Sequence, residues 1–324
     1  MNTPRTILIT GSAGFIGSHL MDLLIDRGDK LVGVDNFCDF YSPQIKRDNS
    51  KKHYISTNAN IYELDLLDYD ALEELFKKYN FTHIVHLAAM AGVRPSLENP
   101  RLYDTVNNHS TINLLDLAKK YKVSKFVFAS SSSVYGSRSV TPFSEDEDIS
   151  KPISPYAATK VSGEAMVHAM THSVDSLSSV CLRFFTVYGA RQRPDLAIHK
   201  FSELIYLGKP IPVYGDGSYQ RDYTYIDDIL DGITKAIDFD TKFEIFNLGE
   251  SQTYTVNELI SLLEIKLKRS AIIAYQDKVT GDVPVTCADI SKAKSLLAYN
   301  PKTHLSEGLD KFIEWFQSKN KILS

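Results

Sequence analysis

The sequence predicts an α/β protein, in which a doubly wound parallel sheet is followed by a smaller mixed α/β C-terminal domain. Up to about residue 186, short apolar runs alternate with segments of helical apolar spacing. This alternation is typical of a parallel sheet covered by helices on both faces. A glycine-rich turn follows the first apolar run, at residues 11–17. Beyond residue 186 the pattern becomes irregular, which indicates a second domain.

The first part of the chain supplies the elements of the sheet. Strands are expected at the short apolar runs, which are residues 7–10, 30–34, 61–64, 83–87, 125–129 and 179–185. Helices are expected where apolar residues recur every three to four positions, at residues 18–25, 69–79, about 104–121 and from 156 onward. Asp68 could cap one of them. We assign residues 1–186 and a returning segment at about 221–247 to this N-terminal domain.

The smaller domain is expected to comprise about residues 187–220 and 248–324. A helix at 196–207 ends at Gly208, and a strand at 211–214 follows it. Thr255 and Glu258 form a capping-box pattern at the start of a later helix. Further helices are expected at 225–238 and 305–317.

Composition excludes several function classes. The 324 residues are 43% hydrophobic and 23% charged, as in a soluble globular protein. A net charge of −4 argues against nucleic-acid binding, and no apolar run is long enough for a membrane span. The few residues before the first strand leave no room for a signal peptide. Three cysteines, an odd number far apart in sequence, favour a reducing, cytoplasmic setting, and no histidine–cysteine spacing predicts a metal site.

The glycine-rich turn predicts a dinucleotide site. Gly11 permits a tight turn after the strand, Gly14 lets a pyrophosphate approach the backbone, and Gly17 allows close packing of the helix. The helix N-terminus then faces the phosphates with free N–H groups. Asp35 ends the next apolar run about twenty residues later, where a carboxylate can accept both hydroxyls of an adenosine ribose. Such a carboxylate repels a 2′-phosphate and favours NAD, although Asn36, Lys46 and Arg47 keep NADP as the alternative.

Other cofactor contacts are expected after the following strands. Small residues there let the backbone pass close to the cofactor, and a loop at Asp65 can contact adenine. Asn107 is expected to hold the backbone near the catalytic residues. The predicted cofactor-binding residues are Gly11, Gly14, Phe15, Ile16, Gly17, Asp35, Asn36, Asp65, Leu66, Leu87, Ala88, Ala89, Asn107, Tyr156 and Lys160.

A catalytic trio is predicted at Ser131, Tyr156 and Lys160. Tyr156 and Lys160 are four residues apart at a helix start and therefore share a face. A nearby ammonium lowers the pKa of a phenol, so that the phenolate can act as a base. Ser131 can hydrogen-bond the reacting oxygen. Together these groups could take a proton from an alcohol while hydride leaves to NAD.

Along nearly its whole length the chain resembles an extended short-chain dehydrogenase/reductase of the nucleotide-sugar epimerase and dehydratase group. The glycines, Asp35 and the catalytic trio carry this resemblance, together with Arg183-Phe184-Phe185, Tyr188-Gly189, Arg221-Asp222-Tyr223 and Gly281-Asp282. Within the group, four stretches are most similar to UDP-glucuronate 4-epimerases. They are Asp39-Phe40-Tyr41, Ala91-Gly92-Val93-Arg94, Phe185-Thr186-Val187-Tyr188 and Arg193-Pro194-Asp195.

The resemblance implies a Rossmann domain that binds NAD and a domain that binds a UDP-sugar. The implied reaction converts UDP-glucuronate to UDP-galacturonate through a transient 4-keto sugar, in a cytoplasmic homodimer. Arg221 and Lys200 could neutralise the diphosphate, and Val213 and Tyr214 could contact uracil. Arg193, with Thr186, Ser132 and Ser133, is expected to hold the sugar carboxylate. Arg94 and Asp282 complete the predicted substrate-binding residues.

Four alternative functions are considered. In the group, 4,6-dehydratases carry acids after the position of Ser131, and 4-keto decarboxylases carry a glutamate two residues before the position of Tyr135. Ser132 and Ser133 occupy these positions here, so an epimerase is favoured. A UDP-glucose/UDP-galactose 4-epimerase is the next alternative. An NAD-binding sensor without turnover would not need the complete trio.

Overall fold

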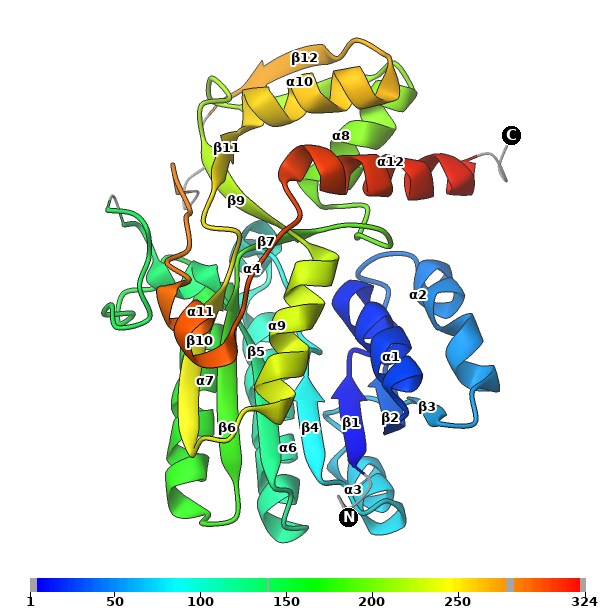
Figure 1. Ribbon diagram of the computed structural model, residues 1–324, viewed down its shortest axis with the longest axis vertical. Coiled ribbons are helices and arrows are strands. Elements are labelled where there is room, and N and C mark those ends of the chain that lie inside the picture. Colours follow the sequence, from blue (N-terminus) through cyan, green and yellow to red (C-terminus); the bar gives the residue numbers. More distant parts are fainter. Residues whose placement is uncertain (1–4, 139, 278–282, 321–324) are drawn as a thin grey trace. The chain divides into compact units, whose positions relative to one another are not determined.

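The chain forms two compact units, and the computed structural model describes residues 5–138, 140–277 and 283–320 (Figure 1). The first unit comprises Met1–Gly136, Asp148–Arg183 and Gly232–Phe246. The second comprises Ser137–Glu147, Phe184–Asp231 and Asn247–Ser324. Among the described residues, none of the helices combines the length and apolar character needed to cross a lipid bilayer.

A seven-stranded sheet forms the centre of the first unit, which confirms the predicted α/β fold class. Its strand order is β10-β6-β5-β4-β1-β2-β3, and the last residues of β6 and β10 pass into the second unit. The pairs of β1 with β2 and β4, of β2 with β3 and of β4 with β5 are all parallel. The strands are Thr6–Thr10 (β1), Lys30–Asp35 (β2), Ala59–Glu63 (β3), His83–His86 (β4), Lys125–Ser131 (β5), Ser178–Phe184 (β6) and Phe243–Leu248 (β10).

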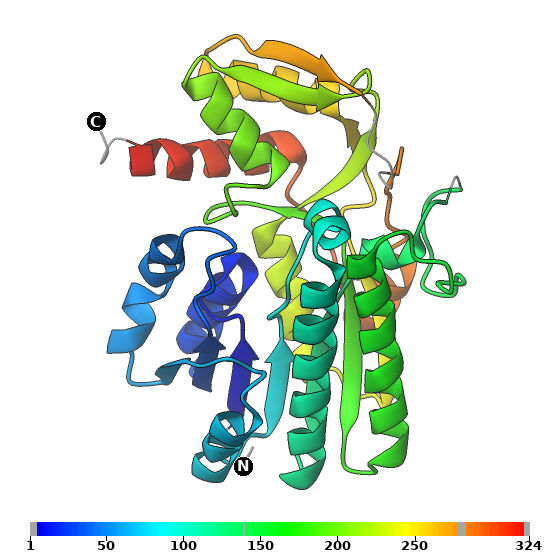
Figure 2. The ribbon, with the colours of Figure 1, turned by 180° about the vertical axis from the view of Figure 1, so that it is seen from behind.

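Strand order reverses between β1 and β4, which makes their carboxyl ends the switch point where doubly wound sheets bind ligands. Helix α1 covers one face of the sheet, and α6 and α7 cover the other (Figures 1 and 2). The buried core on the latter face joins Leu8 and Phe126 of the strands to Leu114 and Val167 of these helices. The helices of this unit are Phe15–Arg27 (α1), Pro43–Ser50 (α2), Tyr69–Lys78 (α3), Val93–Glu98 (α4), Pro100–Asp104 (α5), Ser110–Lys120 (α6) and Pro155–Ser173 (α7).

Local signals set several helix ends. The side chain of Asp68 accepts a hydrogen bond from the Ala71 N–H and caps α3, as the sequence predicts. Ser154 caps α7 in the same way, and Pro155 occupies its first turn. The prediction of one continuous α-helix at about 104–121 is wrong in one respect, because the helix is interrupted. A π-helical turn at Thr105–His109 separates α5 from α6, and such turns are frequent at functional sites.

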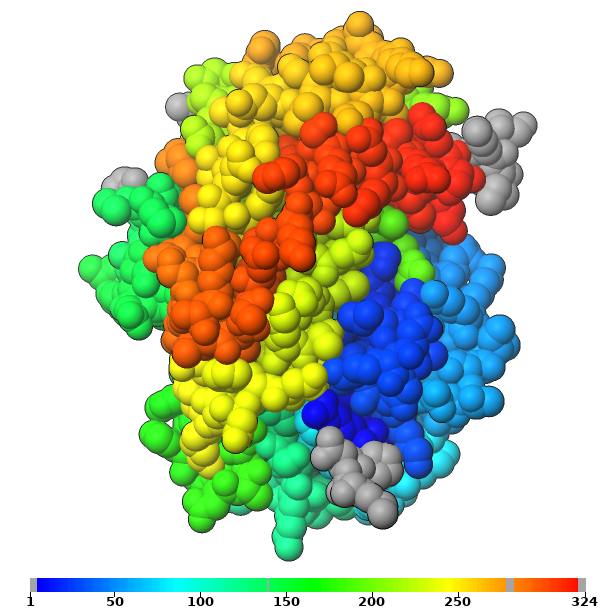
Figure 3. Space-filling view, viewed as in Figure 1, coloured from blue at the N-terminus to red at the C-terminus, as the bar shows by residue number. Residues whose placement is uncertain are grey.

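The second unit contains two small sheets. In the first, β9 (Gln220–Tyr225) pairs antiparallel with β11 (Thr253–Thr255) and parallel with β7 (Thr186–Tyr188). In the other, β8 (Pro210–Tyr214) pairs parallel with β12 (Ile272–Gln276). The predicted capping box of Thr255 and Glu258 is confirmed at the start of α10. The helices are Ala197–Tyr206 (α8), Ile226–Asp238 (α9, which ends in the first unit), Val256–Leu267 (α10), Ser291–Leu297 (α11) and Leu305–Asn320 (α12). Figure 3 shows α10 and α12 at the molecular surface.

Candidate active site

The glycine-rich turn joins β1 to α1 at the switch point of the sheet. Gly11 has a φ of +68°, and a Cβ atom there would lie 2.9 Å from the backbone nitrogen of Ala88. A Cβ atom on Gly17 would lie 2.1 Å from the carbonyl oxygen of Gly11, so only glycine permits this packing. Gly14 is the N-cap of α1, and Phe15 and Ile16 begin the helix. This backbone has the form that dinucleotide pyrophosphates require.

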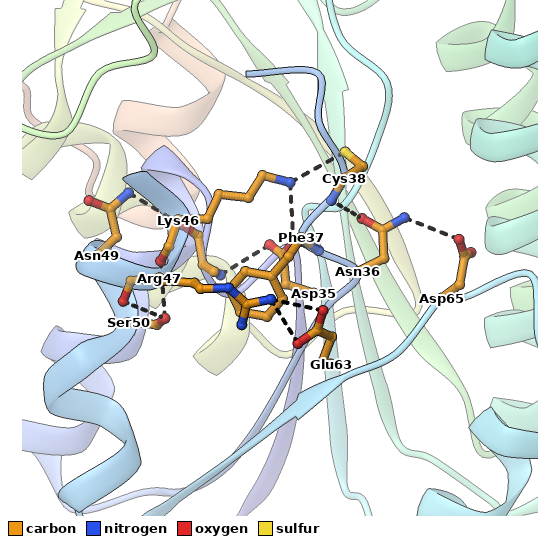
Figure 4. A network of polar contacts seen from close by, with 11 residues as sticks. Asp35, Asn36, Phe37, Cys38, Lys46, Arg47, Asn49, Ser50, Glu63 and Asp65 are labelled. Carbon is orange, nitrogen blue, oxygen red and sulfur yellow. Dashed lines mark hydrogen bonds and ion pairs between the residues drawn. The ribbon is translucent and has the colours of Figure 1, made fainter. Parts of the chain in front are cut away.

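The Asp35 carboxylate lies beside this turn and is almost completely buried (Figure 4). Its Oδ2 accepts from the Ala13 N–H at 3.2 Å, and its Oδ1 accepts from the Phe37 N–H at 2.8 Å. The Lys46 ammonium, also buried, donates to Oδ1 at 3.2 Å. Lys46, one of the residues that kept NADP as an alternative, neutralises Asp35 in the structure.

The neighbouring loop continues this polar network. Asn36 Nδ2 donates to Asp65 Oδ2 at 3.1 Å, and Asp65 Oδ1 accepts from the Leu67 N–H at 2.9 Å. The carbonyl oxygen of Leu66 accepts from Asn113 Nδ2 at 2.9 Å. Asn36 and Asp65 are exposed, so their polar atoms can meet a ligand at the ends of β2 and β3.

Hydrogen bonds from Thr10 of β1 and from Asn107 fix the backbone of the residues after β4. The half-buried Leu87, Ala88 and Ala89 follow the strand, and the Ala88 N–H donates to Thr10 Oγ1 at 3.2 Å. Asn107, in the π-helical turn, accepts from the Met90 N–H at 2.8 Å and donates to the Met90 carbonyl oxygen at 3.0 Å.

The same Asn107 amide donates to Thr159 Oγ1 of α7 at 2.9 Å. Asn107 therefore joins the loop after β4 to the helix that carries Tyr156 and Lys160. This is the backbone-holding role that the sequence suggested for Asn107.

The predicted catalytic trio lies within the first unit, on two adjoining elements. Ser131 ends β5, and its hydroxyl is 3.1 Å from Ser133 Oγ. Tyr156 and Lys160 lie in the first turns of α7, and the Lys160 ammonium is 5.9 Å from the centre of the Tyr156 ring. The Tyr156 ring also contacts Tyr103 edge to face, with the ring centroids 6.3 Å apart. The Tyr156 phenol is only half-buried and can meet a substrate.

The buried environment of Lys160 shifts the pKa of its ammonium group. Complete burial lowers its pKa to about 8, although the nearby Glu164 carboxylate opposes this shift. Its ammonium donates to the Ala129 carbonyl oxygen at 2.7 Å, which fixes it under the end of β5. At neutral pH Lys160 therefore retains a proton and a positive charge near Tyr156.

A buried ion pair that was not predicted from the sequence, Arg183 with Glu164, lies beside the trio. Glu164 accepts from Arg183 Nε at 3.0 Å and from Nη2 at 2.8 Å, and it also accepts from the Ser130 hydroxyl. Arg183 Nη1 donates to the Tyr135 hydroxyl at 3.0 Å. The pair thus joins α7 to both ends of the segment that contains Ser131, Ser132 and Ser133. Spacing offered one signal, because Glu164 is four residues after Lys160 on the same helix face.

Most of the predicted substrate-binding residues belong to the second unit. Arg193 forms a two-point ion pair with Asp195, with Nε–Oδ1 and Nη2–Oδ2 distances of 3.0 and 2.8 Å. Arg221 donates to the Gln220 carbonyl oxygen at 2.8 Å. Thr186 begins β7, Lys200 is exposed on α8, and β8 carries the buried Val213 and half-buried Tyr214. Arg94 is exposed on α4 of the first unit, and Asp282 lies outside the described residues.

Within the part of the chain that the structure describes, no group of three or more His, Cys, Asp or Glu side chains could hold a metal ion. Cys38, Cys181 and Cys287 are free thiols.

This arrangement matches a known family. The family model described as GDP-mannose 4,6 dehydratase matches residues 8–312. The chain belongs to this family. The resemblance to short-chain dehydrogenases/reductases that act on nucleotide sugars is thereby confirmed.

Several known proteins are similar along nearly the whole chain. A UDP-glucuronate 4-epimerase of Thermodesulfobacterium geofontis is 40% identical over 317 residues, which are 98% of this chain and 97% of the relative. The UDP-glucuronic acid 4-epimerase of Bacillus cereus, in complex with UDP-glucuronic acid and NAD, has a TM-score of 0.92 at 37% identity, covering 97% of this chain and 100% of that one. A Thermotoga maritima UDP-glucose 4-epimerase with UDP-glucose has a TM-score of 0.90 at 34% identity, covering 98% and 100%.

Proposed function

We propose that this protein is an NAD-dependent UDP-glucuronate 4-epimerase, which interconverts UDP-glucuronate and UDP-galacturonate. The observation that carries the proposal is the complete trio of Ser131, Tyr156 and Lys160. The two positions directly after Ser131 are serines, whereas dehydratases and decarboxylases of the group carry an acid there. The similarity to epimerases crystallised with UDP-glucuronic acid and NAD supports it.

The first unit fits NAD through its glycine turn, the N-terminus of α1 and the Asp35 carboxylate. Bound NAD would supply a reversible hydride acceptor for carbon 4 of the sugar, and inversion requires that the hydride return to the opposite face of that carbon. Tyr156 takes the proton of the carbon-4 hydroxyl, and the Lys160 ammonium stabilises the phenolate. Ser131 hydrogen-bonds the same oxygen, which becomes the ketone of a transient 4-keto sugar. Tyr156 then returns the proton, so the protein ends each turnover in its starting state.

The second unit would bind the UDP-sugar, with Arg221 and Lys200 near the diphosphate, Val213 and Tyr214 near uracil, and Thr186 and Arg193 near the carboxylate. Asp282 and Arg94 remain further proposed contacts. A homodimer is part of the proposal, and exposed apolar side chains at Leu97, Leu102 and Ile112 of the first unit are suited to such an interface. The free thiols are consistent with a cytoplasmic enzyme.

The proposal is tested by incubating the purified protein with UDP-glucuronate, UDP-glucose and dTDP-glucose and identifying the products by NMR. UDP-galacturonate as the principal product supports it. Preferential conversion of UDP-glucose to UDP-galactose would assign the alternative 4-epimerase activity. A 4-keto-6-deoxy sugar would show a dehydratase, and a 4-keto pentose would show a decarboxylase.

A further inference from the structure

Two ion pairs lie side by side at the ends of β2 and β3, each formed by a strand carboxylate and a cation of α2 (Figure 4). Asp35 and Glu63 are directly opposite each other in the parallel register of these strands. Lys46 and Arg47, consecutive residues of α2, pair with them one by one. The four side chains therefore form a compact group with two negative and two positive charges.

The two pairs differ in solvent exposure. The Lys46–Asp35 pair is buried, with side chains only 7% and 5% exposed, and Lys46 Nζ also lies 3.3 Å from Cys38 Sγ. In the outer pair, Arg47 and Glu63 are 46% and 54% exposed. Arg47 Nη2 is 3.0 and 3.1 Å from the two Glu63 carboxylate oxygens. The Arg47 guanidinium stacks on the Phe37 ring at 4.6 Å, which orients it beside the Asp35 loop.

We propose that Glu63 is a second determinant of cofactor choice, which engages Arg47 and so denies it to a 2′-phosphate. The proposal rests on the NAD-binding function proposed above. A dinucleotide 2′-phosphate is held by arginine through paired, charge-assisted hydrogen bonds. Here each candidate cation is already matched by one carboxylate, and the exposed Asp65 carboxylate beside Asn36 adds further negative charge. An adenosine with a free 2′-hydroxyl needs no cation, so the same arrangement accepts NAD.

The experiment titrates NAD and NADP separately into the purified full-length protein and measures both dissociation constants by calorimetry. Glu63→Gln keeps the side-chain shape and removes its charge. It should tighten NADP binding by about three- to tenfold and leave NAD binding within about twofold, since one partly exposed charge pair is altered. The gain should shrink at high salt.

Two further variants identify the group responsible. Adding Arg47→Met to Glu63→Gln should abolish the gain in NADP affinity. Glu74→Gln is the matched control, because Glu74 is an exposed glutamate paired with Lys77 on α3 and its substitution changes net charge equally. This control should leave the ratio of the two dissociation constants unchanged.

An unchanged ratio in Glu63→Gln, with NAD still bound, would overturn the role of Glu63 and leave the proposed function standing. A gain that persists without Arg47, or that Glu74→Gln reproduces, would also overturn it. If the parent protein binds neither dinucleotide, both this inference and the proposed NAD dependence are wrong.

Discussion

At the residue scale, the chemistry depends on a positive charge that the fold holds close to a phenol. Lys160 is buried and fixed by the Ala129 carbonyl oxygen, and its pKa of about 8 keeps it protonated at neutral pH. Tyr156, one helical turn earlier, remains half-buried and reachable. A substitution that removes the base should therefore abolish turnover without abolishing NAD binding.

We expect Tyr156→Phe to retain NAD binding within about threefold and to lose turnover by about a hundredfold or more, because only the proton acceptor is removed. Calorimetric titration with NAD and an NMR assay of UDP-glucuronate conversion measure the two properties. Activity within tenfold of the parent would contradict the role of Tyr156 as the base.

The other prediction at this scale concerns Arg193. Oxidation at carbon 4 of a hexuronic acid gives a β-keto acid, which loses carbon dioxide unless its carboxylate is held out of alignment. Arg193 would have to exchange its partner Asp195 for the substrate carboxylate. We expect Arg193→Ala to lose most uronate turnover and to leak 4-keto pentose.

Asp195→Asn removes the charge that pairs with the Arg193 guanidinium and so frees this group for the substrate. It should lower KM for UDP-glucuronate by about two- to fivefold, which corresponds to the free energy of a surface ion pair. Epimer and pentose products are scored separately by NMR for both variants. Unchanged epimerisation by Arg193→Ala would show that another group holds the carboxylate.

At the scale of elements, buried carboxylates join the loops of the second unit. Asp222 of β9 accepts from the backbone N–H groups of Glu250, Ser251 and Ala288 at 2.8, 3.0 and 3.1 Å. Glu250 lies next to it, with a side chain only 7% exposed and one oxygen 3.1 Å from His304 Nδ1. Burial and the adjacent Asp222 charge raise the pKa of Glu250 to about 7, and the hydrogen bond from His304 opposes this.

This shift predicts a pH dependence of stability. The folded-state pKa of Glu250 lies above the ordinary value of 4.5, so the folded state retains a proton that the unfolded chain has released. The free energy of unfolding should therefore fall as pH rises from about 4.5 to 7.

Glu250→Gln cannot ionise and should reduce this fall by about 1–3 kcal/mol, as measured by urea denaturation at several pH values. Glu307→Gln, at an exposed glutamate of α12, is the control and should keep the parent dependence. An identical pH dependence in parent and Glu250→Gln would refute the assignment.

At the scale of the whole molecule, the proposed cofactor and substrate sites belong to different units. The glycine turn, the Asp35 network and the catalytic trio belong to the first unit, whereas Thr186, Arg193 and Arg221 belong to the second. Each ligand should therefore stabilise its own part of the chain before turnover begins.

Hydrogen exchange followed by mass spectrometry tests this division. We expect NAD to slow exchange at residues 11–17 and 35–38, because binding stabilises the state that binds by about 2.7 kcal/mol at a hundredfold excess over Kd. UDP-glucuronate added to the Tyr156→Phe variant with NAD should slow exchange at residues 186–221. Protection by NAD that is confined to the second unit would contradict the assignment.

Features that depend on residues close together in the chain were predictable before folding was considered. Apolar periodicity predicted the parallel sheet with its covering helices, and the glycines predicted the turn that β1 and α1 require. The caps at Asp68 and Thr255 were also correct, since a cap joins residues three positions apart.

Contacts between residues far apart in the chain depend on how the elements pack. The pairing of Arg47 with Glu63 follows from the register of β2 and β3, and the pairing of Glu164 with Arg183 follows from the packing of α7 beside β6. The helix expected at about 104–121 is interrupted where Asn107 bonds Met90 and Thr159. Periodicity reports which face of an element is buried, but it carries no information on which distant polar group meets that face. That choice is made when the elements pack, because each buried charge or amide must then find a partner.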